Sequence, residues 1–255
     1  MYNPGMFNAQ HILYIIISGI LTVLLLGLAA KYAKDDKTKN KILKFFAVIT
    51  VVIHYSNLRD DYFTTGGTTI ENNQILPIYP CNVVMWMLLI ASMLENKKRL
   101  LFQLLSEFCF YGGTVCGVIG IVLNTNFGNT PTLADYGILK GMLSHSTMLL
   151  GCLYMLVGGF VKIRVFNAVS VTAGLATFVL CGAGVNALYE FFGMEAPDGM
   201  WLRSNPYFSF SPMVLGIVFV LLLFGALALW EMRLPVEDRW YHRLNRRKEN
   251  ERIIL

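Results

Sequence analysis

Long apolar segments alternate with short polar or charged segments along nearly the whole chain. Most of the apolar segments reach the roughly 18 residues with which a helix crosses the ~30 Å hydrocarbon core of a bilayer. The segment at 42–56 is shorter and ends in polar residues. Seven spans are expected, at about 11–30, 42–56, 75–94, 100–123, 139–161, 165–191 and 212–230.

The pattern predicts an all-α fold, a polytopic membrane helix bundle of about seven transmembrane helices. No linker is long enough to separate two domains, so residues 1–255 are expected to form a single transmembrane domain with a basic tail at 233–255. Composition agrees, because 55% of the residues are hydrophobic and only 15% are charged, against about 25% charged residues in soluble domains. An ordinary soluble domain is therefore excluded.

The basic residues lie almost entirely in every second connection between the spans. They occur at 31–44, 97–99, 162–164 and 233–252. Of the 21 Lys and Arg residues, only Arg59, Lys140 and Arg203 fall on the other side. Because Lys and Arg collect on the cytoplasmic side, we expect a multi-pass protein of the cell membrane, with its N-terminus outside and its C-terminus cytoplasmic. The net charge of +5 then reflects topology, and no nucleic-acid partner is expected. The tail is expected either to lie on anionic headgroups or to be solvated.

With this orientation, the polar residues within the spans gather near the outer leaflet. They are His54 in the second span, Cys81 and Asn82 in the third, Asn124 at the end of the fourth, Ser144 and His145 in the fifth, and Asn186 and Tyr189 in the sixth. The inner halves of the helices read as almost wholly apolar. Buried polar groups are costly in a bilayer and usually face the bundle interior or a water-filled cavity. This outer layer is therefore the candidate site.

Within the layer, Cys81 has the setting of a possible nucleophile. Proline is favoured in the first turn of a helix, so Pro80 is expected to begin the third span and to place Cys81 beside unpaired backbone N–H groups. Such a position favours the thiolate, and the N–H groups could hold an oxyanion. His145 shares this depth and is the best candidate for the partner base, with His54 as the reserve.

Plainer interpretations stand beside each of these. A cysteine near a helix end is usually a packing residue, and a transmembrane histidine often only bonds across helices. Asn124 and Asn186 could merely cap helix ends or bond between helices. The odd number of cysteines, five, does not suggest a disulfide framework. The four scattered histidines have no metal-ligand spacing, so neither a metal nor a cofactor is expected.

The sequence resembles the YwaF family of bacterial integral membrane proteins over about residues 11–230. The resemblance rests on a Leu-Pro-x-x-x-Cys motif at the start of the third span and on polar residues in the fifth and sixth spans. Its anchors are Leu76, Pro77, Cys81, Val83, His145, Asn186 and Tyr189. A vertebrate relative of that family is a membrane acyltransferase that places polyunsaturated chains on ether phospholipids, proposed to work through a cysteine. The resemblance implies that Cys81 accepts the acyl group and that His145 is its base.

Some positions depart from the family pattern. Tyr79 and Pro80 stand where bacterial members often have a histidine, and Ser144 precedes the fifth-span histidine where they often have glycine. The sequence hypothesis is a lipid acyltransferase, transacylase or acyl hydrolase that uses membrane phospholipids as partners and passes through an acyl-thioester. The alternatives are a transporter or a small-molecule-binding sensor with the same polar layer as its ligand site. The oligomeric state is not determined by the sequence.

Overall fold

The computed structural model describes residues 6–56, 76–124, 127, 131–203 and 212–241, and all regular elements in these ranges are helical. The helices are α1 (Ala9–Tyr32), α2 (Asp36–Tyr55), α5 (Pro80–Met93), α6 (Leu100–Phe108), the π-helical segment η1 (Cys109–Gly113), α7 (Thr114–Val122), α9 (Tyr136–Val157), α10 (Asn167–Phe191), the 3-10 turn η2 (Gly199–Trp201), α11 (Pro212–Glu231) and the 3-10 turn η3 (Val236–Asp238). Because α6, η1 and α7 follow one another without a break, they form one long helix. Each expected span therefore corresponds to a helix at nearly the expected position. Tail residues 242–255 lie outside the described ranges.

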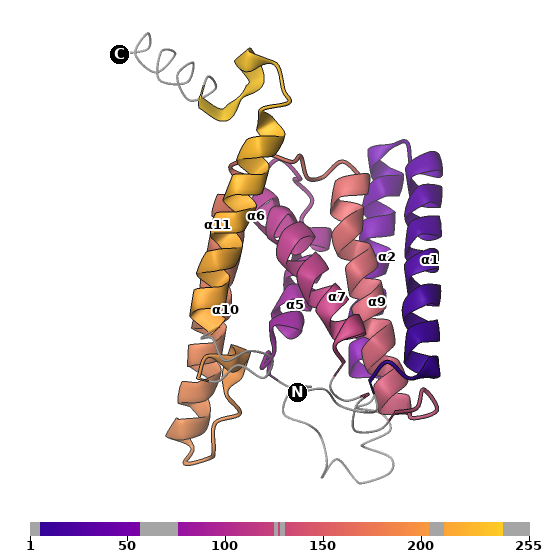
Figure 1. Ribbon diagram of the computed structural model, residues 1–255, viewed down its shortest axis with the longest axis vertical. Helices are drawn as coiled ribbons and strands as arrows, with labels where there is room; N and C mark the ends of the chain where they lie inside the picture. Colours follow the sequence, from indigo (N-terminus) through magenta and orange to yellow (C-terminus); the bar gives the residue numbers. More distant parts are fainter. Residues whose placement is uncertain (1–5, 57–75, 125–126, 128–130, 204–211, 242–255) are drawn as a thin grey trace.

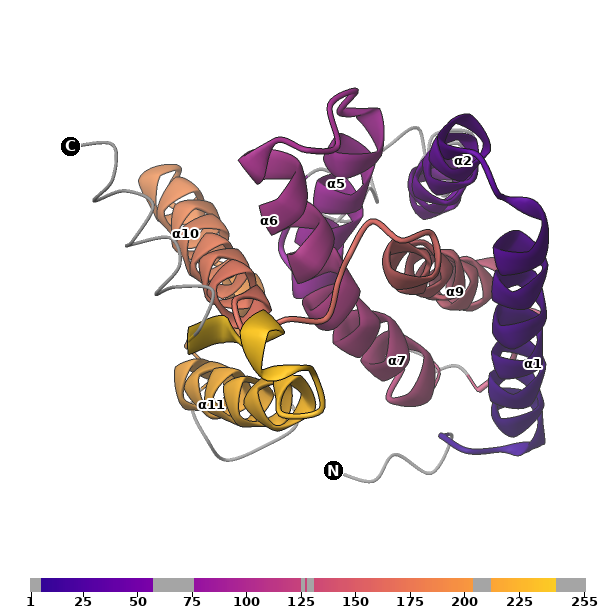
Figure 2. The same ribbon diagram turned by 90° about the horizontal axis from the view of Figure 1, so that it is seen from above.

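The helices form a bundle with a separate outer pair (Figures 1 and 2). Helix α9 packs against α1, α2 and α7, and α5 packs against α2 and α6. On the other side, α10 packs on α6, and α11 packs on α10. The pair α10–α11 thus reaches the rest of the molecule chiefly through α6, which leaves room beside α5, α7 and α9.

Among the described residues, four helices are long and apolar enough to cross a membrane by length and composition. They are Ala9–Tyr32, Leu100–Val122, Asn167–Phe191 and Met213–Glu231. Helix α5 is apolar but shorter, α2 begins with a charged segment, and α9 is largely buried among its neighbours. The side chains of α1 and α11 are mostly exposed and apolar, as expected for helices that face lipid. The protein is therefore a multi-span membrane protein, with four spans supported individually.

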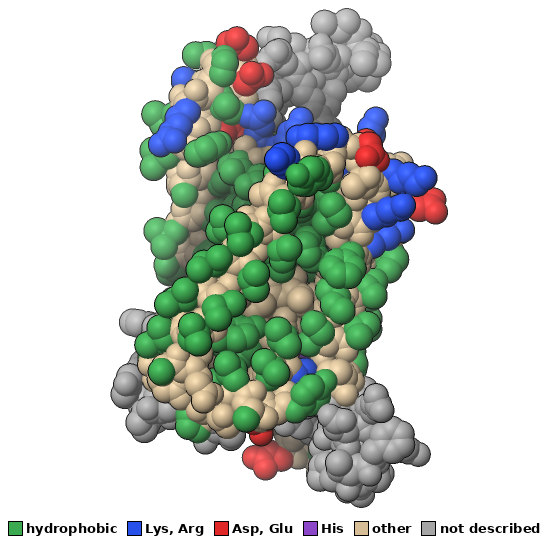
Figure 3. Space-filling view, turned by 90° about the vertical axis from the view of Figure 1, so that its right-hand side faces the viewer, with side chains coloured by type: hydrophobic (Ala, Val, Ile, Leu, Met, Phe, Trp, Pro, Cys, Tyr) green, Lys and Arg blue, Asp and Glu red, His purple; other side chains and the backbone are tan. Residues whose placement is uncertain are grey.

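Charge is concentrated at one end of the bundle. Figure 3 shows Lys and Arg side chains gathered at the end where α1 passes into α2 and α5 into α6, with apolar side chains below them. The start of α5 and the end of α7 lie at the opposite end (Figure 1). The two ends of the molecule thus differ strongly in charge, as the sequence predicts.

Local sequence explains where several helices begin. Asn8 and Asp135 each accept a backbone N–H three residues later, which caps α1 and α9 at 3.0 and 2.9 Å. Asp35 caps α2 in the same way, and the hydrogen bonds from Thr38 hold the pKa of its carboxyl below the usual range. Such side chains satisfy N–H groups that have no partner within the helix. Helix α5 begins at Pro80, as predicted.

Hydroxyl groups join α9 to its neighbours. Thr50 on α2 donates to Thr147 on α9 at 3.0 Å. The hydroxyls of Tyr14 and Ser18 on α1 each lie 2.9 Å from the Ser146 hydroxyl. Such bonds between helices stabilise membrane bundles modestly, and here they hold α9 in place at the centre of one side of the molecule.

Glu231 connects three segments at the basic end. Its side chain is 1% exposed, and its two oxygens accept the backbone N–H groups of Val165 and Trp240, each at 2.8 Å. Glu231→Ala leaves both donors without this acceptor, at about 1–3 kcal/mol for each buried group. We expect a clear fall in the midpoint of thermal unfolding in detergent. Glu237→Ala, at an exposed position nearby, is the control and should leave the midpoint close to wild type; equal midpoints for the two variants would contradict this role.

Candidate functional site

A cavity of about 1770 Å³ lies between the helix bundle and the pair α10–α11. One wall comes from the ends of α2 and α7 and the starts of α5 and α9, and it carries most of the polar groups. The opposite wall comes from α10 and α11 and is apolar, with side chains such as Leu175, Phe178, Ile217 and Val220. The site is therefore amphipathic across its width.

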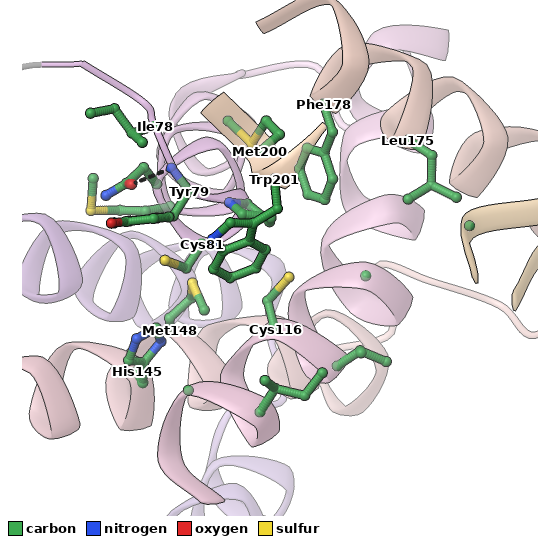
Figure 4. Close-up of a pocket in the computed structure, with 18 of the residues that line it drawn as sticks. Ile78, Tyr79, Cys81, Cys116, His145, Met148, Leu175, Phe178, Met200 and Trp201 are labelled. Atoms are coloured by element: carbon green, nitrogen blue, oxygen red, sulfur yellow. Dashed lines mark hydrogen bonds between the residues drawn. The ribbon is translucent and has the colours of Figure 1, made fainter. Parts of the chain in front are cut away.

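Cys81 lines the polar wall from the first turn of α5. Pro80 is the first residue of this helix. Proline lacks a backbone N–H, and an N–H in the first turn would have no acceptor within the helix, so no hydrogen bond is lost there. The residue is partly exposed, and Figure 4 shows its side chain directed into the cavity beside Met148. The structure thus places Cys81 where a molecule in the cavity can meet its sulfur.

Asn82 holds the start of α5 in a defined geometry. Its Oδ1 accepts the Tyr79 N–H at 3.0 Å, and its Nδ2 lies 3.2 Å from His54 Nε2. Because an amide nitrogen can only donate, His54 must accept this bond through Nε2. His54 is therefore hydrogen-bonded to Asn82, the residue that follows Cys81, and it also lines the cavity. The structure brings His54, Asn82 and Cys81 together as the sequence predicts.

His145 reaches the same cavity from α9. Its imidazole lies against Gly120 on α7, where an added Cβ would sit 2.5 Å from both Cγ and Cε1 of the ring. Among the described residues, no hydrogen bond joins His145 to Cys81, and in the view of Figure 4 Met148 lies between them. Cys81 and His145 thus share a cavity without direct contact.

The remaining predicted residues have structural partners. Asn124 donates to the Gly120 carbonyl at 3.2 Å and accepts the Phe127 N–H at 3.1 Å, so it closes the end of α7 while also lining the cavity. Asn186 accepts the Gly199 N–H at 2.7 Å, and Tyr189 packs on Ile78 and Val185. Asn186 and Tyr189 do not line the cavity. Asn186 instead holds the η2 segment against α10, and Tyr189 packs against the segment before α5.

Sequence reasoning missed the side chains that shape the space around Cys81. Met148, Cys116 and Trp201 line the cavity near it (Figure 4). Cys116 has the place of a packing cysteine in its helix, and Trp201 lies in a connection with no motif. A signal existed only for Met148, which follows Ser144 and His145 on the same face of α9 at helical spacing.

The expectation that the inner halves of the helices are almost wholly apolar is wrong. Near the basic end, the Ser170 hydroxyl on α10 donates to the Glu107 carboxylate on α6. The Tyr111 hydroxyl, in the π-helical segment, donates to Asn167 Oδ1 at 3.2 Å. These bonds stabilise the contact between α6–η1 and α10. The pairs were overlooked because their members lie 63 and 56 residues apart in the sequence, so no local pattern joins them.

The chemistry of the cavity follows from its two walls. A polar group, such as an ester, can approach Cys81, Asn82 and His145 while an attached hydrocarbon chain lies against α10 and α11. Ligand sites commonly combine an apolar surface with a few convergent polar groups. A thiol and an imidazole that border one space are also the groups that thiol-based acyl transfer requires.

Comparison with known proteins identifies a family for almost the whole chain. The model of the TMEM164 family, a family of transmembrane proteins, matches residues 6–242. No curated protein and no solved structure matches. The family match does not confirm the resemblance to the YwaF family. Because it covers well over half of the sequence, the chain belongs to the TMEM164 family.

Proposed function

We propose that this member of the TMEM164 family is a membrane lipid acyltransferase or transacylase, with Cys81 as nucleophile and His145 as base. The observation that carries the proposal is that both side chains border one cavity whose opposite wall is apolar. An acyl chain could remain on the α10–α11 wall while its ester carbonyl reaches the thiol. The chemistry needs no cofactor, and membrane phospholipids are its partners.

The charge distribution supports a site near the outer leaflet. Basic residues gather at one end of the bundle (Figure 3), and the starts of α5 and α9 lie toward the other. Under the positive-inside rule, the basic end is cytoplasmic, the N-terminus is outside and the C-terminus is inside. An acyl ester would then enter sideways from the outer leaflet of the cell membrane.

The reaction proceeds in two balanced steps. In the first, His145 takes the thiol proton, and the Cys81 sulfur attacks the ester carbonyl. The carbon–oxygen bond breaks, and the alcohol leaves with the proton from His145, so that an acyl-thioester remains on Cys81. In the second, His145 takes the proton of an acceptor alcohol, or of water in hydrolysis. The acceptor oxygen attacks the thioester, and the thiol is regenerated when the carbon–sulfur bond breaks.

The separation of Cys81 and His145 in the free protein is compatible with this mechanism. Catalytic hydrogen bonds are often long without substrate and tighten only in the complex. Met148 is flexible because it is unbranched, so a bound chain can displace its side chain. His54 and Asn82 support the site by orienting the first turn of α5.

The proposal is tested by mass spectrometry of the purified protein after incubation with mixed phospholipids and acyl trapping. We expect a fatty acyl group on the peptide that contains Cys81, with release by neutral hydroxylamine, because thioesters react with it at neutral pH. Cys152 is fully buried, so its peptide is the internal control and should stay unmodified. An unmodified Cys81 in folded, lipid-bound protein would contradict the proposal.

A transporter or sensor remains the second candidate, and one observation favours it. The long helix Leu100–Val122 contains the π-helical segment Cys109–Gly113 near its middle, and irregular helices often mark binding sites in transporters. Substrate-dependent uptake into vesicles would support transport. Ligand binding that is unaffected by loss of Cys81 would support a sensor.

A further inference from the structure

The short turn η2 closes one side of the cavity. Met200, Trp201 and Leu202 all line the cavity, and the Trp201 ring lies 5.5 Å from that of Tyr79, two residues before Cys81. Figure 4 shows the indole directed into the space between the Cys81 and Cys116 side chains. Trp201 is thus the largest side chain that this turn places beside the thiol.

The turn is bonded to the segment just before α5 and to α10. The Met200 N–H donates to the Ile78 carbonyl, just before α5, at 2.6 Å. The Gly199 N–H donates to Asn186 on α10 at 2.7 Å. Gly199 also lies close to Gly182, because a Cβ added at Gly182 would sit 2.5 Å from the Gly199 carbonyl oxygen. The position of the turn therefore depends on contacts that a single methyl group can disturb.

The backbone of the turn is in an unfavourable conformation. Asp198, Met200 and Trp201 have φ angles of 53°, 57° and 52°, in the left-handed region that side chains disfavour. Such a conformation persists only where surrounding contacts enforce it. The turn therefore keeps this conformation only while its surrounding contacts hold.

We propose that residues 198–202 form a mobile segment that covers the cavity, and that Trp201 limits the size of the molecule that reaches Cys81. When the turn is in place, only small groups pass the indole. When it moves from Ile78, the space beside Cys81 opens toward the end of the bundle opposite the basic residues. This inference rests on the geometry of the cavity alone, and it holds whether or not Cys81 carries an acyl group.

The test compares how fast a small and a large maleimide modify Cys81 in nanodiscs. N-ethylmaleimide is the small reagent and fluorescein maleimide the large one, and peptide-resolved mass spectrometry follows the Cys81 peptide. The ratio of the two rate constants cancels any change in the reactivity of the thiol itself. The measurement needs no acyl substrate, so its failure is distinct from failure of the acyltransferase proposal.

Two variants are expected to raise the large-to-small ratio by about fivefold or more, because one shifts the turn toward its open position and the other removes the side chain that narrows the space. Gly182→Ala displaces the turn, and Trp201→Ala removes the indole but keeps the backbone contacts. The matched control is Gly184→Ala on the same helix, where an added Cβ meets nothing within 4 Å. Its ratio should equal that of wild type. A wild-type ratio in Trp201→Ala would overturn the role of Trp201, and a wild-type ratio in folded Gly182→Ala, or an equal rise in Gly184→Ala, would overturn the movement of the turn. If Gly182→Ala does not fold, Asn186→Ala replaces it, because it removes the acceptor of the Gly199 N–H.

Discussion

Cys81→Ser is expected to lower acyl turnover by at least about 1,000-fold, the size of loss seen when a covalent nucleophile is removed. Serine has nearly the shape of cysteine, so the start of α5 and its bonds through Asn82 should be retained. A hydroxyl gives up its proton far less readily than a thiol, so His145 is expected to activate it much less. Phospholipid acyl transfer in reconstituted vesicles measures the effect.

Cys181→Ser is the control for this prediction. Cys181 is a half-buried cysteine on α10 that does not line the cavity, so its substitution should leave turnover near wild type. Both proteins should show the same elution profile and thermal midpoint. Cys81→Ser with wild-type turnover would exclude Cys81 as the nucleophile and would move the interpretation toward the transporter or sensor.

Gly120→Ala is expected to lower acyl turnover by about tenfold to 100-fold, because a misplacement of about 1 Å in a catalytic group can cost that much. The added methyl group would overlap the His145 imidazole, at 2.5 Å from Cγ and Cε1. Alanine is a better helix former than glycine, so α7 itself should persist. The ring must then move away from its present place in the cavity. Turnover and the extent of Cys81 acylation both measure the result.

Two controls separate this effect from a general disturbance. Gly225→Ala places its methyl group on α11 where nothing lies within 4 Å, so turnover should not change. In a double-mutant cycle, Gly120→Ala should cause no further loss once His145 is alanine, because the two changes act through the same contact. Full turnover in Gly120→Ala would show that the observed position of His145 is not needed.

The sequence predicted the positions of the helices well. Helix positions follow from a local requirement, since a span must be long and apolar wherever it packs, and Pro80 marks the start of α5 by its own chemistry. The prediction also placed Cys81, Asn82, His54 and His145 in one region, because depth along a span follows from counting residues. All four line the same cavity.

The rest of the site depends on contacts that residue spacing does not encode. Asn186 and Tyr189 share the expected depth with Cys81, but they do not line the cavity, because Asn186 bonds to the η2 turn and Tyr189 packs on Ile78. The depth of a residue along its span does not determine the direction in which its side chain points, because the rotation of each helix is set by packing against its neighbours. For the same reason, no pattern indicated that Trp201 would lie beside Cys81.

By itself, the sequence determined a bundle of helices with a charged end, an apolar surface and a polar layer near the opposite end. These properties follow from the free energy of transfer of each residue between water and hydrocarbon, which is largely a local quantity. Only the tertiary structure decided that α10 and α11 stand apart to leave a cavity, and that Gly120 accommodates the imidazole of His145. Those features arise from the fit of side chains that are distant in sequence, where a single methyl group decides whether two helices can approach.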